Sequence, residues 1–186
     1  MDWDSVFDEK YKSRGASQAI LDRFIAQVGQ PITEAEVREV NRRQQNPFPP
    51  SDPLYAEYRP LDPSVWVIPH RPLPLSYLDF LRWSNGGEFR TGARWFQFFG
   101  TPHVRHMMRA YLLPEHMQGA LPIAFNGGGI FYLFDLRKAA VKGEYPVVCA
   151  SAGVLGWKRD QCKLVARSFL AACRGTVDIG TLLYPD

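Results

Sequence analysis

Apolar residues near the start of the chain recur with the spacing of an amphipathic helix. They stand at positions i, i+3, i+4 and i+7: Leu21, Phe24, Ile25 and Val28. This period predicts a helix over residues 17–28, with Ser17 as its N-cap. A second helix is predicted from Thr33 to about Gln45, because Thr33 and Glu36 have the spacing of a capping box.

The next segment, residues 46–74, contains nine of the fifteen prolines in the chain. Proline lacks the backbone N–H that helices and central strands need, so we expect an extended connection with at most one short strand, near residues 65–68. Four aromatic residues are interleaved with the prolines: Phe48, Tyr55, Tyr58 and Trp66. They favour a loop pinned to the surface of the domain, and a proline-rich ligand of an SH3 or WW domain is the alternative.

The second half of the chain is dominated by short apolar runs. A short helix is predicted at residues 76–83, with Ser76 as its N-cap and Asn85-Gly86-Gly87 at its end. Four strands are expected at 94–99, 121–125, 130–135 and 145–149. Residues 103–118 are predicted to form either a helix or an irregular excursion, and residues 160–174 a closing helix.

Short connections between the strands indicate an antiparallel arrangement. The glycine run Asn126–Gly129 lies between two strand candidates, which predicts a hairpin turn rather than a phosphate-binding loop opening a helix. Helices come first, strands cluster, and one helix closes the chain. This order predicts the α+β class: a single domain with a mostly antiparallel central sheet, flanked by N-terminal helices and a closing C-terminal helix.

The composition is that of a soluble globular protein, with 46% apolar and 22% charged residues in a chain of 186. No apolar run approaches the roughly 18 residues of a membrane helix. The acidic start Met1–Asp4 lacks an apolar segment, so we expect no signal peptide. Residues 1–93 carry a net charge of −2 and residues 94–186 a net charge of +5, without the clustered basic residues of nucleic-acid-binding proteins. We therefore expect no membrane partner and do not favour a nucleic-acid partner.

The chain contains three cysteines, Cys149, Cys162 and Cys173, and no Cys-x-x-Cys motif. An odd number without that motif argues against a disulfide framework and indicates a reducing, cytoplasmic environment. Cys162 and Cys173 are eleven residues apart, which predicts buried thiols on one face of the closing helix.

Side chains that could perform catalysis or hold a metal are few. His103, His106 and His116 lie within 14 residues, with Glu115 beside the last, but they lack the His-Glu-x-x-His spacing of a catalytic zinc helix. Asp135 ends a strand and fits either a general base or a turn cap. No Gly-x-Ser-x-Gly motif occurs. We predict a non-enzymatic protein without metal or cofactor, and a small metal-dependent protein using these residues is the alternative.

Arg94 to Phe99 places aromatic rings beside an arginine, as an RNA-binding sheet does. A strand that is apolar on both faces is more simply explained as a central strand. Nucleic-acid binding remains the second alternative and would use Arg90, Arg94, Trp95 and Arg105.

Three motifs occur in a fixed order along the chain. The first runs from Leu73-Pro74 to Leu81 and closes with Asn85-Gly86-Gly87, the second spans Pro122–Asp135 around the glycine turn, and the third is Val165–Leu170. Together they resemble the signatures of the SUKH superfamily, the Smi/Knr-type domain named for a yeast cell-wall assembly regulator. The resemblance covers about residues 32–175. It implies a role in the family fold for Leu73, Pro74, Tyr77, Phe80, Leu81, Asn85, Gly86, Gly87, Gly128, Gly129, Asp135 and Phe169.

The resemblance implies a single α+β domain that binds proteins and performs no known chemistry. Bacterial relatives often act as immunity proteins that neutralise a cognate secreted toxin, frequently a nuclease, and others look like scaffolds or regulators. We therefore expect a protein partner, such as a toxin encoded nearby. Two features depart from the family pattern: residues 1–31, expected as an N-terminal helical extension, and a proline-rich insertion at 46–72 within a domain spanning 32–186.

Candidate partner-binding residues follow from charge and from aromatic or imidazole chemistry. A net charge of +3 does not suit an inhibitor of a basic nuclease, so either the toxin is of another kind or a local acidic patch binds it. Glu34, Glu36 and Glu39 are the candidates for such a patch. The remaining candidates are Arg94, Trp95, His103, Arg105 and His106.

Overall fold

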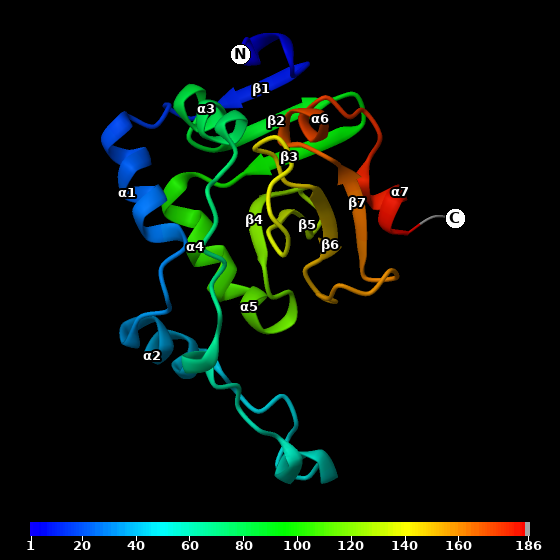
Figure 1. Cartoon of the computed structure of the whole chain (residues 1–186). Coiled ribbons are helices and arrows are strands. Elements are labelled where there is room, and N and C mark those ends of the chain that lie inside the picture. Colours follow the sequence, from blue (N-terminus) through cyan, green and yellow to red (C-terminus); the bar gives the residue numbers. More distant parts are fainter. Residues whose placement is uncertain (185–186) are drawn as a thin grey trace.

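A computed structural model describes residues 1–184, which form one seven-stranded sheet surrounded by helices (Figure 1). The strands follow one another across the sheet in chain order, and each neighbouring pair is antiparallel. They are β1 (Glu9–Lys12), β2 (Gly87–Thr91), β3 (Arg94–Phe98), β4 (Ala120–Phe125), β5 (Ile130–Asp135), β6 (Val147–Ser151) and β7 (Cys162–Ala166). The predicted α+β class and antiparallel sheet are confirmed.

The helices are α1 (Gln18–Val28), α2 (Glu34–Arg43), α3 (Leu75–Trp83), α4 (Thr101–Ala110), α5 (Leu113–His116), α6 (Phe169–Cys173) and α7 (Ile179–Leu183). Both N-terminal helices begin at their predicted caps. The Ser17 side chain accepts a hydrogen bond from the Ile20 N–H, and Thr33 and Glu36 form the reciprocal capping box. The segment 103–118 is helical, divided between α4 and α5.

The glycine turn at 126–129 is a hairpin, as its sequence predicts. It joins β4 to β5, and the Asn126 side chain accepts hydrogen bonds from the N–H groups of Gly128 and Ile130. Gly127 and Gly129 have φ near +80°, a left-handed conformation that glycine adopts without steric strain. The turn therefore closes a hairpin and opens no helix.

The prediction of a long closing helix at 160–174 is wrong. Its first part is strand β7, which pairs with β6, and only Phe169–Cys173 forms a helix. The central strand β6 is almost completely buried, so its free edge needs hydrogen-bond partners, and β7 supplies them. Ser168 then caps α6 by accepting from the Ala171 N–H. Tertiary pairing thus outweighs the helical spacing of the apolar residues.

The cysteines therefore lie on different elements. Cys149 is on β6, Cys162 on β7 and Cys173 on α6, so the prediction that the last two share one helix face is also wrong. All three are unpaired. Burial raises the pKa of the Cys149 and Cys162 thiols to about 11, and it raises the pKa of Cys173 well above its usual range.

Residues 1–12 contribute more than a helical extension. β1 pairs along the whole of its length with β2 and extends the sheet by one strand. Trp3 is only 1% exposed and its ring packs edge-on against Phe80, at 5.3 Å between centroids. The ring centroid of Phe7 lies 4.7 Å from that of Phe89. The start of the chain is therefore part of the core.

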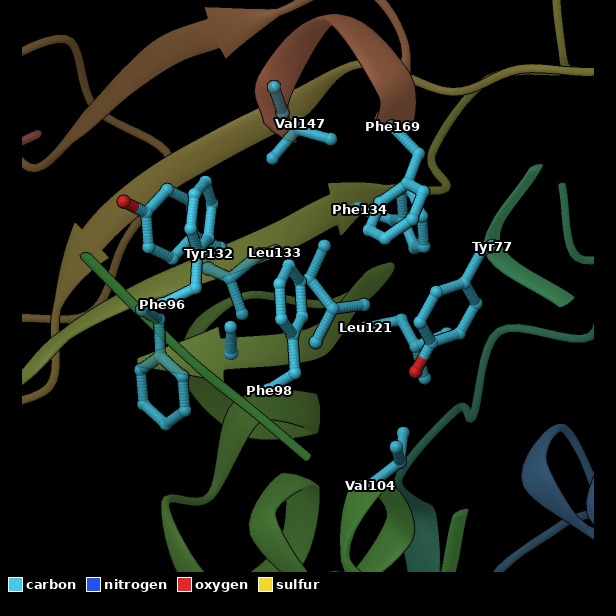
Figure 2. Packing of buried hydrophobic residues seen from close by; sticks show 14 of the residues in the cluster. Tyr77, Phe96, Phe98, Val104, Leu121, Tyr132, Leu133, Phe134, Val147 and Phe169 are labelled. Atoms are coloured by element: carbon cyan, nitrogen blue, oxygen red, sulfur yellow. The ribbon is translucent and has the colours of Figure 1, made fainter. Parts of the chain in front are cut away.

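An aromatic core fills the space between the sheet and the helices α3 and α6. Figure 2 shows Tyr77, Phe134 and Phe169 gathered beside Phe98, and the ring centroid of Phe169 lies 5.2 Å from that of Tyr77. Tilted and edge-on ring pairs of this kind contribute about 0.5–1.5 kcal/mol each beyond the area that they bury. The first and third sequence motifs, far apart along the chain, meet in this core.

The N-cap of α3 is Pro74, not Ser76. The hydroxyl of Ser76 instead donates to Glu144, whose other carboxylate oxygen accepts from the Phe169 N–H at the start of α6. Glu144 therefore links the two helices that cover the aromatic core. The predicted turn after α3 is confirmed, since Gly86 and Gly87 both have positive φ.

Candidate protein-binding surface

One arginine of α4 holds the N-terminal helices to the domain. Arg105 donates from Nε and Nη2 to the two carboxylate oxygens of Glu36 on α2, both at 2.7 Å. The same guanidinium reaches four main-chain carbonyls, those of Gln27, Val28, Gln30 and Pro31, at 2.8–3.2 Å. Arg105 thus caps the C-terminal end of α1 and anchors α2 at once.

Arg109 lies one turn further along α4 and extends this ion-pair network. It donates to Glu36 at 2.6 Å and to Glu39 at 3.1 Å. Although burial alone would raise it, the pKa of Glu36 falls from about 4.5 to about 2, because hydrogen bonds from Arg105 and Thr33 and the two arginine charges favour the carboxylate. The Arg109 Nε atom is buried and has no hydrogen-bond partner among residues 1–184.

The anchored helix α2 leads into a projecting segment, residues 46–62, which we name the arm. In Figure 1 it extends away from the sheet below α2. Its base is closed by two hydrogen bonds between the Gln44 side chain and the main chain of Leu61, at 2.6 and 2.9 Å. Asn46 also donates to the Tyr55 carbonyl.

The aromatic residues of the proline-rich segment have different environments. Trp66 is buried and donates from Nε1 to Glu115 at 2.8 Å, which agrees with a segment pinned to the domain. Tyr55 is 42% exposed, as is its neighbour Leu54 at 44%. The prediction of a pinned loop is therefore wrong for the arm, where the prolines keep the chain extended. The segment 46–74 contains two short 3₁₀ turns and no strand.

A pocket of about 560 Å³ lies where the arm meets the domain. Its apolar lining includes Val40 of α2, Leu61 of the arm and Leu112, which connects α4 to α5. Leu112 has a left-handed backbone, with φ +52°, that turns the chain sharply beside the pocket. Four cationic or imidazole side chains also line it: Arg43, Arg59, Arg109 and His116.

The predicted acidic patch is largely neutralised by arginines. Glu36 is paired with Arg105 and Arg109, and Glu39 with Arg43 and Arg109. Glu34, whose side chain is 94% exposed, pairs with Arg38 one turn away. The carboxylates that sequence reasoning assigned to a partner thus mainly attach α2 to the domain.

The other candidates are scattered. Arg94 is only 4% exposed and donates to the carbonyls of Ala172 and Val177, so the structure contradicts its assignment to a partner or an RNA surface. Trp95 is half-buried, and its register partner on β2 is Arg90, which pairs with Glu9. On α4, His103 is exposed, and His106 lines a second pocket between α1 and α4, of about 380 Å³.

The two carboxylates considered for catalysis or metal binding have structural contacts. Glu115 accepts the Trp66 hydrogen bond, and Asp135 forms an ion pair with Arg137 at 2.7 Å that holds the pKa of the Asp135 carboxyl below its usual value despite burial. Across residues 1–184, no group of three or more His, Cys, Asp or Glu side chains is placed to hold a metal ion. No helix in that range is long and apolar enough to cross a membrane.

Most residues of the sequence motifs are buried in the fold. Tyr77, Phe80, Leu81 and Phe169 are fully buried. Asn85 caps α4, because its side-chain oxygen accepts from the Thr101 N–H at 2.8 Å while its amide donates to the Thr101 hydroxyl. Gly128 and Gly129 lie exposed in the hairpin turn. These positions explain the fold and identify no partner.

Sequence reasoning missed Arg59 and Arg109. Arg109 follows Arg105 by four residues, so a definite helix at 101–110 would have placed both on one face. Arg59 carries no such signal, because its position depends on how the arm returns to the domain.

Comparison with protein families gives one match. Residues 70–171 match the model of the SMI1/KNR4 family (SUKH-1), which is more than half of the chain. The matched region begins after α1, α2 and the arm and runs from α3 to the first residues of α6. A search of curated proteins gives no match.

Proposed function

The chain belongs to the SMI1/KNR4 family (SUKH-1), and from this membership we propose that it is a non-enzymatic protein-binding module that neutralises a cognate toxin. The family match is the observation that carries the proposal, because immunity proteins are a common class among bacterial relatives with this domain. The protein acts by covering a surface of its partner and leaves the partner chemically unchanged.

The placement of reactive side chains supports this proposal. The two carboxylates considered for catalysis or metal binding already have partners: Asp135 forms an ion pair with Arg137, and Glu115 accepts a hydrogen bond from Trp66. The thiols have raised pKa values, which disfavours the nucleophilic thiolate. Three unpaired cysteines also support our proposal of a reducing, cytoplasmic location.

The arm provides separate support for partner binding. It lies outside the family match, projects from the domain and exposes Leu54 and Tyr55. Apolar and aromatic side chains on a preorganised projection bind partners with a low entropy cost. A feature added to a shared domain is also suited to distinguish one partner from another.

Co-expression with the product of the neighbouring gene tests the proposal. We expect the two proteins to co-purify and the toxicity of the neighbouring product to be suppressed. A scaffold or regulatory role would instead give co-purification without any toxicity to suppress. Failure of both co-purification and rescue would refute partner neutralisation.

A further inference from the structure

We propose that the pocket at the base of the arm binds a carboxylate-bearing segment of the partner protein, with an apolar side chain of that segment inserted between the arm and α2. This inference rests on the proposed function, because it specifies the chemistry of the partner. It concerns a site formed by α2, the arm and the connection between α4 and α5.

The pocket combines an apolar interior with positive charge. Val40, Pro47, Leu61 and Leu112 contribute apolar surface, and none of its described lining residues is acidic. Burial of an apolar side chain there contributes about 1.5–3 kcal/mol. A segment carrying both an apolar and an acidic residue matches this combination.

The arginines differ in how far their charge is neutralised. Arg43 is paired with Glu39, and Arg109 with Glu36 and Glu39. Arg59 is exposed and donates to the main-chain carbonyls of Ala56 and Tyr58. Its hydrogen bonds therefore place no opposite charge beside the guanidinium, which leaves it able to pair with a carboxylate.

Arg109 provides a second positive charge at the pocket. It lines the pocket, its side chain is 14% exposed, and its Nε–H is buried without a partner in the described part of the chain. Because Arg59 and Arg109 line the same pocket, a carboxylate bound there is attracted by both guanidinium groups.

The geometry of the site is fixed before binding. The paired hydrogen bonds between Gln44 and Leu61 close the base of the arm, and Arg105 fixes the helix from which the arm departs. Prolines restrict the backbone of the arm further. Preorganisation lowers the entropy that a partner segment must overcome.

Fluorescence anisotropy with three labelled probes tests this inference. The first probe is a short peptide with a phenylalanine flanked by glutamates, the second replaces each glutamate with glutamine, and the third is a single-stranded RNA. The variants are Arg59→Glu and, as a control with the same charge change, Arg174→Glu at the exposed end of α6, far from the arm in Figure 1.

We expect the acidic peptide to bind the unmodified protein and the glutamine peptide to bind at least tenfold more weakly. Arg59→Glu should weaken the affinity for the acidic peptide at least tenfold, about 1.4 kcal/mol, whereas Arg174→Glu should change this affinity less than twofold. The inference would be overturned by equal affinity of Arg59→Glu and Arg174→Glu for the acidic peptide. It would also be overturned if the unmodified protein did not bind that peptide, or bound the RNA more tightly than the peptide. Arg59→Gln removes the positive charge without adding a negative one, so it should reduce the affinity for the acidic peptide less than Arg59→Glu does.

The neighbouring gene product separates this inference from the proposed function. If the toxin binds the unmodified protein and Arg59→Glu equally, neutralisation stands and the pocket is refuted as its site. If the toxin binds neither while the acidic peptide still depends on Arg59, the pocket stands and neutralisation of that toxin is refuted.

Discussion

Replacing Arg105 with alanine should detach α1 and α2 from the domain more effectively than any other single substitution on α4. The side chains of Arg105 and Glu36 are each 15% exposed, so their ion pair is only weakly screened by water. The change removes both bonds to Glu36 and four bonds to carbonyls that follow or end α1.

The magnitude follows from the Glu36 carboxylate. Its pKa of about 2, against about 4.5, corresponds to about 3 kcal/mol at 1.36 kcal/mol per unit. Arg109 retains part of this stabilisation in the variant, and residual exposure screens another part. At the surface, water molecules can donate hydrogen bonds to most of the main-chain carbonyl groups that lose Arg105. We therefore expect Arg105→Ala to lower the free energy of unfolding by about 2–3 kcal/mol, which is below the roughly 3–5 kcal/mol for breaking a fully buried pair.

Urea denaturation followed by tryptophan fluorescence measures this loss, with Arg38→Ala as the matched control. Arg38 also pairs with a glutamate of α2, but its side chain is 68% exposed, so its loss should cost about 0.3–0.5 kcal/mol. In Arg105→Ala, the backbone amides of α1 and α2 should exchange hydrogen faster than those of the rest of the domain. Losses of equal size for the two variants, or unchanged exchange in both helices, would refute the anchoring role of Arg105.

Three further predictions concern pH, the core and the turn after α3. Because the folded pKa of Glu36 lies below its unfolded value, its contribution to stability is fully present above about pH 5 and is lost as the pH falls toward 2. The midpoint of urea unfolding should therefore fall more steeply between about pH 5 and 2 in the unmodified protein than in Glu36→Gln. Parallel curves for the two proteins would contradict this. Trp3→Ala should cost about 3–5 kcal/mol, because the indole is buried among core rings although it lies outside the family match; a loss below about 1 kcal/mol in thermal unfolding would show that the N-terminus is not part of the core. Asn85→Ala should cost about 1–2 kcal/mol by leaving the start of α4 uncapped, with Asn85→Asp retaining most of the stability; equal losses for both in urea unfolding would argue against capping.

The sequence predicts those elements whose signals are local. Helix α1, the capping box of α2 and the hairpin at Asn126–Gly129 each depend on residues that contact one another within a few positions. The same holds for strands β3 to β6, whose apolar runs are long enough to be recognised. The α+β class is predicted from the order of helices and strands along the chain, although among these strands only β4 and β5 are joined by a short turn and α4 and α5 lie between β3 and β4.

The missed strands β1 and β7 depend on pairing with another strand, whereas β2 was missed although it forms a tight hairpin with β3. β1 (Glu9–Lys12) is rich in charged residues, and all four of its residues are exposed. It carries no apolar alternation and becomes a strand by pairing with β2. β7 is a strand because the buried β6 needs a second neighbour. The candidate site shows the same limit, since Arg59 and Arg109 meet at one pocket only after the arm has returned to α4.

Native mass spectrometry of the protein mixed with the purified product of the neighbouring gene tests protein binding without chemistry most directly. We predict a stable complex from which both chains are recovered with their original masses. Absence of a complex, or recovery of a partner with an altered mass, would contradict the assignment of this chain as a non-enzymatic binding module.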